Sequence, residues 1–116
     1  MKTRTIMLAM ATMLMAAPVF AQGVPMKEEK PGLLKRAKVT ADAATAAAQA
    51  KVPKGKIASA EIEEENGKLI YSFDVKTKGK TGIDEVNVDA ITGKVSVQHE
   101  TPRDEARERA ADKKKM

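Results

Sequence analysis

The stretch Val86–Val97, with the sequence VNVDAITGKVSV, decides the fold of this chain. Two runs of alternating apolar and polar residues flank a polar turn that contains Asp89 and Gly93. Alternation with a period of two is typical of a strand with one buried face, and Asp and Gly favour tight turns. The stretch therefore predicts a pair of adjacent strands whose four valines point to a core, Val86, Val88, Val95 and Val97.

Two further strands precede this pair. Residues 56–64 and 68–76 alternate in the same way, and Asn66-Gly67 between them is a strong hairpin signal. Every second residue of 69–75 is large and apolar, which predicts one buried and one solvated face. That pattern is typical of an antiparallel sheet.

A helix is predicted between Val39 and Val52, because alanine, the best helix former, dominates this segment. Thr40 can act as the N-cap, and Pro53 and Gly55 end the helix. Alanine has little side-chain volume, so a sheet can approach this helix closely. The sequence thus predicts an α+β fold with one alanine-rich helix packed on a three- to four-stranded antiparallel sheet. The predicted core is Ala43, Ala47, Ala50, Ile62, Leu69, Tyr71, Phe73, Val75, Val86, Val88 and Val95.

The two ends of the chain differ from this domain. Residues 1–21 combine a basic start, an apolar run and the tripeptide Val19-Phe20-Ala21, which is typical of a secretory signal peptide. We expect 22–36 to be a linker because it is rich in Pro, Gly and charge. Residues 37–100 form the domain, and 101–116 form a charged helical tail.

Composition excludes several classes of function. The chain has 21 basic and 16 acidic residues, and loss of Lys2 and Arg4 with the signal peptide would leave a net charge of only +3. Nucleic-acid binding would need a concentrated basic patch with stacking aromatic side chains. The absence of cysteine rules out thiol catalysis and disulfides. We therefore expect no nucleic-acid partner and no stable membrane insertion after cleavage, and the oligomeric state stays open.

These segments together resemble a PepSY domain, a small exported bacterial module also found in propeptides of thermolysin-type metallopeptidases. The resemblance covers roughly Val39 to Gln98. It rests on the helix that opens with Val39-Thr40-Ala41 and on its exit Val52-Pro53-Lys54-Gly55. It also rests on the Ala60-Glu61-Ile62-Glu63 strand, the strand around Tyr71, and the motif VDAITGKV at 88–95.

The resemblance implies a helix packed on an antiparallel sheet and a role in restraining peptidases. No peptidase follows the domain in this chain, so such action would occur in trans. The family-motif positions, mainly structural, are Thr40, Pro53, Gly55, Tyr71, Val88, Asp89, Thr92 and Gly93.

Few residues suggest chemistry. Asp89 lies in a turn that lacks the repeated carboxylates of a calcium loop, and His99 is the only histidine. We expect no catalytic residues, no metal site and no cofactor. A possible binding face is formed by Glu61, Glu63, Ile70, Ser72 and Asp74.

The sequence therefore predicts a non-enzymatic protein of the periplasm or the extracellular space. Its function would be to bind a protein partner, a peptidase or an envelope protein, and to inhibit or regulate a peptidase in trans. The alternative is a structural or sensory envelope protein that binds a small ligand or a cation and has no peptidase target.

Overall fold

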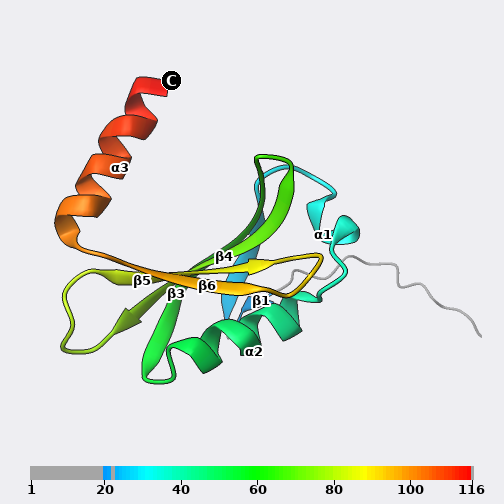
Figure 1. Cartoon of the computed structure of the whole chain (residues 1–116), viewed down its shortest axis with the longest axis horizontal. Helices are drawn as coiled ribbons and strands as arrows, with labels where there is room; N and C mark the ends of the chain where they lie inside the picture. Colours follow the sequence, from blue (N-terminus) through cyan, green and yellow to red (C-terminus); the bar gives the residue numbers. More distant parts are fainter. Residues whose placement is uncertain (1–19, 22, 116) are drawn as a thin grey trace, which may run out of the picture.

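The computed structural model of the chain describes residues 20–21 and 23–115. Figure 1 shows a twisted sheet with one long helix along one side and a second helix that continues from the last strand. The elements in chain order are β1 (Phe20–Ala21), β2 (Val24–Glu28), α1 (Leu33–Arg36), α2 (Ala41–Lys51), β3 (Gly55–Glu65), β4 (Lys68–Thr77), β5 (Ile83–Asp89), β6 (Val95–Glu100) and α3 (Pro102–Lys115).

The sheet is mixed, which corrects the predicted fold class. Strands β3 to β6 form an antiparallel meander, but β2 pairs in parallel with β3 through Met26 opposite Ala60. The two-residue β1 pairs antiparallel with β2, so the strand order is β1-β2-β3-β4-β5-β6. The overall class remains α+β, but the predicted three- to four-stranded antiparallel sheet with one helix is wrong, because β2 adds a parallel fifth strand to the meander.

The fifth strand comes from 22–36, the segment expected to be a linker. Met26 is 7% exposed and Leu33 is 2% exposed, so both belong to the core. Pro is tolerated near the start of a strand at the sheet margin, as Pro25 shows in β2. A short strand with one buried residue shows too little alternation of apolar and polar residues to be recognised from sequence. Most of the expected signal peptide lies outside the described residues.

Helix α2 forms where alanine was expected to form it. The Thr40 hydroxyl accepts a hydrogen bond from the Ala43 N–H at 3.1 Å, and the Gln49 side-chain amide donates to the carbonyl oxygens of Val52 and Gly55 at the helix exit. The buried face of α2 differs from the prediction. It consists of Ala41, Ala44, Thr45 and Ala48.

Ala43 and Ala50 are exposed, and Ala47 is only partly buried. Alanine on every side of a helix leaves no amphipathic stripe, so the sequence does not define which face is buried.

The strand residues of the core follow the prediction closely. Tyr71, Phe73, Ile62, Leu69, Val75, Val86 and Val88 are all at most 4% exposed. The rings of Tyr71 and Phe73 stack with a centroid separation of 6.4 Å. Val95 is partly buried, and Val97 is 43% exposed because it lies on the edge strand. A register shift between Ile57 and Ser59 buries Ile57, which the simple alternation missed.

Tyr71 also connects the sheet to the start of α2. Its hydroxyl donates to the Val39 carbonyl oxygen at 2.7 Å. The N–H groups of Lys38 and Val39 both donate to the Ala90 carbonyl oxygen at 2.9 Å. Ala90 is fully buried, and its own N–H donates to the Leu69 carbonyl oxygen. The turn after β5 is thereby tied to the entry of α2.

Helix α3 has a different character from α2. Thr101 caps it, since its hydroxyl accepts from the Asp104 N–H at 3.2 Å. Every α3 side chain that the structure describes is exposed except Asp104, which is half-buried. None of the described helices has the length and apolar character needed to cross a membrane.

The Tyr71 hydrogen bond can be tested with a Tyr71→Phe variant. We expect the free energy of unfolding to fall by about 1 kcal/mol, because the Val39 carbonyl loses its partner in a partly buried position. Urea unfolding followed by circular dichroism measures this change. An Ile91→Ala control, at a side chain 44% exposed, should stay within about 0.5 kcal/mol of the wild type. A fully stable Tyr71→Phe protein would contradict this role.

Candidate functional site

The sheet has an outer face, which we define as the face opposite α2. All five residues of the expected binding face lie on it. Cross-strand register places Glu63 opposite Ile70 and Glu61 opposite Ser72. Asp74 follows on β4, where its carboxylate accepts a hydrogen bond from the Ser59 hydroxyl at 3.1 Å. The structure therefore brings these five side chains together on β3 and β4.

A shallow hollow of about 250 Å³ surrounds Ile70 on the outer face. Ile70 supplies its apolar floor, and two cations and several polar side chains form its walls. The lining residues are Lys68, Ile70, Asn87, Asp89, Lys94 and Ser96. An apolar side chain surrounded by polar groups is the arrangement from which protein interfaces are built.

Carboxylates dominate the outer face beside this hollow. Burial, together with the neighbouring charges of Glu61, Glu65 and Glu29, raises the pKa of Glu63 to about 7. Two conditions combine here, since desolvation and like charge both disfavour the ionised form. The face therefore favours a positively charged group that would relieve this repulsion.

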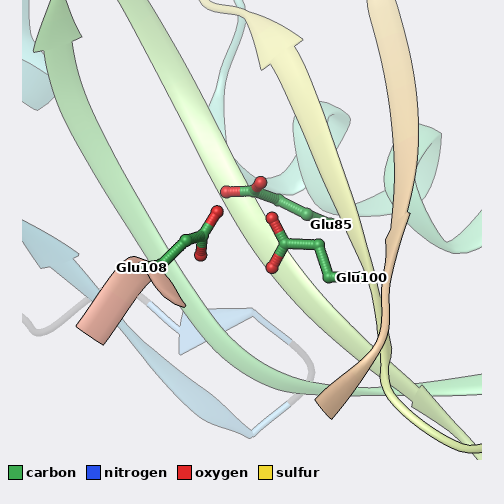
Figure 2. Close-up of side chains that lie close together, drawn as sticks. All are labelled: Glu85, Glu100 and Glu108. Carbon is green, nitrogen blue, oxygen red and sulfur yellow. The ribbon is translucent and has the colours of Figure 1, made fainter. Parts of the chain in front are cut away.

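A second group of carboxylates lies where β5, β6 and α3 meet. Figure 2 shows Glu85, Glu100 and Glu108 with their carboxylates turned toward one another. One oxygen atom from each of the three lies within 4.8 Å of the other two. Burial and, after it, the hydrogen bonds and charges of Glu108 and Glu85 together raise the pKa of Glu100 to about 8. Burial also raises the pKa of Glu85, while a hydrogen bond from the Ser72 hydroxyl opposes this shift.

Sequence reasoning missed this second group, because its members are far apart in the chain and α3 showed no apolar stripe by which to place it on the sheet. It also missed the partners of Asp84. That carboxylate is 7% exposed and contacts His99 Nδ1 at 2.8 Å and Lys80 Nζ at 3.4 Å. The hydrogen bond with His99 lowers the pKa of Asp84. The single histidine therefore stabilises a buried acid on the α2 side of the sheet.

The turn residues of the motif have structural partners. The Asp89 carboxylate accepts from the N–H groups of Ile91 and Thr92 at 2.8 and 3.0 Å, and these two bonds lower the pKa of Asp89. Gly93 has φ +83°, and its N–H donates to the Asp89 carbonyl oxygen. The Thr92 hydroxyl accepts from the Lys94 N–H. The geometry is that of a self-bonded turn and not of a calcium loop.

The remaining motif positions also have places in the fold. Thr40 is the N-cap of α2, Tyr71 bonds Val39, and Val88 is fully buried. A side chain at Gly55 would collide with Val75 and Val52, so the close approach of the α2 exit to the sheet requires glycine there. Pro53 is exposed in the turn after α2.

The model of the PepSY family, described as "Peptidase propeptide and YPEB domain", matches residues 38–96. The chain belongs to the PepSY family. No curated protein and no solved structure matches the chain. The matched region of this PepSY protein runs from the residue before Val39 to β6. It thus contains α2, β3, β4, β5, the Asp89 turn and the first two residues of β6, while β1, β2, α1 and α3 lie outside it.

The turn of the PepSY motif can be tested at Asp89. An Asp89→Ala variant should lose about 1 kcal/mol in free energy of unfolding, because two backbone N–H groups lose their shared acceptor at a partly solvated site. Asp89→Asn keeps an acceptor oxygen and should retain most of the stability. Equal losses for the two variants in urea unfolding would contradict the structural role.

The electrostatics of Glu63 predict a pH dependence. Glu63 binds its proton more tightly in the folded PepSY domain than in the unfolded chain, where its ordinary value is 4.5. Its contribution to stability is therefore present below about pH 4.5 and is lost as the pH rises to about 7. Urea unfolding across this window should show that the free energy of unfolding falls less steeply with rising pH for Glu63→Gln than for the wild type. The same fall in both proteins would refute this assignment.

Proposed function

We propose that this PepSY protein is an exported, non-catalytic module that binds a protein partner, and that the partner is a peptidase which it regulates in trans. Membership of a family described as a peptidase propeptide domain supports a regulatory or binding role. The signal-like residues 1–21 support export to the periplasm or the extracellular space.

The observation that carries the proposal is the part of the outer face around Ile70, which none of the described helices is seen to cover. Helix α2 packs on the other face, so Glu61 and Glu63 are left beside the Ile70 hollow. Carboxylates at such a position would attract Lys and Arg side chains of a partner, and Ile70 would provide an apolar contact.

The sheet edge supplies a second element of the proposed interface. Strand β6 is the last in the strand order, so an extended segment of a partner could pair with it. Main-chain hydrogen bonds along β6 would give affinity, and the outer face next to them would give selectivity.

The residues support a module that does not itself catalyse a reaction. The chain has no cysteine, and its single histidine contacts the buried Asp84 and not a nucleophile. Since the motif residues Thr40, Tyr71 and Asp89 take part in caps, packing and turns, they too are committed to the fold.

The proposal is tested by adding the purified protein to a panel of exported metallopeptidases and measuring peptide hydrolysis. Inhibition of one enzyme is expected for the wild type. Glu61→Gln/Glu63→Gln should weaken this inhibition about tenfold, since two carboxylates that would pair with cations of the partner are removed. The control is Ala46→Lys/Ala50→Lys, which adds the same net charge on the exposed side of α2 and should inhibit like the wild type.

Two results would contradict the proposal. Unchanged kinetics across the panel would count against peptidase regulation. Equal losses in the outer-face variant and in the α2 control would show that net charge, and not the outer face, governs the interaction.

A further inference from the structure

We propose that Glu85, Glu100 and Glu108 form a binding site for a hard divalent cation, Ca²⁺, and that the bound cation holds α3 against the end of the sheet. The inference does not depend on a peptidase partner. It rests on the geometry of the three carboxylates, on the burial of one of them and on the composition of α3.

The three side chains converge from three separate elements. Glu85 comes from β5, Glu100 from β6 and Glu108 from α3, and each offers an oxygen within 4.8 Å of the others (Figure 2). Oxygen ligands lie about 2.3–2.6 Å from Ca²⁺, so two ligands on opposite sides of one ion are about 5 Å apart. A single ion can therefore reach all three carboxylates.

Glu100 gives an independent reason to expect a ligand. This residue is only 4% exposed, and its carboxylate points into the cluster. Its only side-chain hydrogen-bond partners among the described residues are the other two glutamates, and no basic side chain there forms an ion pair with it. A buried carboxyl group whose only polar side-chain partners are other acids is costly to the fold.

Asp84 shows how the same fold treats another buried acid. It is 7% exposed, yet both Lys80 and His99 contact it. Glu100 lies on the opposite face of the sheet at a similar depth, and its side chain hydrogen-bonds only to acids among the described residues. No basic side chain in the described part of the chain neutralises Glu100, and we infer that a bound cation does so.

A shared proton would relieve only part of this repulsion. One proton neutralises one of three charges, and the nearby Asp74 adds a further negative charge that acts on Glu85. A divalent cation neutralises two charges and binds oxygens of all three side chains at once. The cation therefore matches the cluster better than a proton does.

The composition of α3 supports the same conclusion. None of its side chains that the structure describes is buried, so apolar packing does not hold this helix against the sheet. Glu108 is its contribution to the cluster with β5 and β6. A cation between Glu108 and the two strand residues would supply the missing attachment.

Ligand type selects the cation. All three ligands are carboxylates, and His99, the chain's one histidine, contacts Asp84, so the site favours Ca²⁺ over Zn²⁺. With three protein ligands, water would complete the coordination. We expect a Kd of about 10⁻⁴–10⁻³ M, the range of extracellular calcium modules.

The test is calorimetric titration of the purified protein with CaCl₂. The wild type should bind one Ca²⁺ with a Kd in that range. Glu100→Gln and Glu108→Gln should each weaken binding at least about tenfold, because each removes one of three charged ligands. The control Glu65→Gln removes an exposed carboxylate at the opposite end of the sheet and should leave binding unchanged.

Hydrogen exchange provides a second readout. Saturating Ca²⁺ should slow amide exchange in the N-terminal half of α3 in the wild type but not in Glu108→Gln. Because the Glu108 side chain is exposed, this substitution should not affect folding. Absence of saturable binding, equal Ca²⁺ binding by Glu100→Gln, or Mg²⁺ binding as tight as Ca²⁺ binding would each overturn the proposal.

Discussion

The structure depends on the contact between an alanine helix and a sheet face that carries the large side chains. Ala44 and Ala48 of α2 are fully buried in the same hydrophobic cluster as Tyr71 and Phe73. Because alanine contributes little volume, the two rings supply most of the side-chain bulk between helix and sheet. The Tyr71 hydroxyl then bonds the backbone at Val39, so one residue supplies both packing and alignment.

This arrangement separates structure from binding chemistry. The family motif around Asp89 is used to close a turn and to accept the N–H groups of Lys38 and Val39 at Ala90. The acids with raised pKa values, Glu63 and Glu100, lie on the face that α2 does not cover.

The outer face carries an electrostatic cost. Desolvation and like charges act on the same carboxylates, and both favour the protonated form. Such a face is less stable alone than with a cationic group against it, because binding would remove the repulsion as well as form new contacts. The same physics links the proposed protein partner at Glu61 and Glu63 with the proposed cation at Glu100, although the two sites are separate.

The sequence alone determined the local elements. Alanine content defined α2, alternation defined β3 to β6, and the motif showed the PepSY family, because these signals lie within short segments. Tertiary structure decided the rest. The buried face of α2 depends on the sheet since the helix has no apolar stripe, and β2 gains its place only by pairing with β3. The grouping of Glu61, Glu63, Ile70, Ser72 and Asp74 on one face of two neighbouring strands was predictable from alternation, whereas the meeting of Glu85, Glu100 and Glu108 required the path of α3.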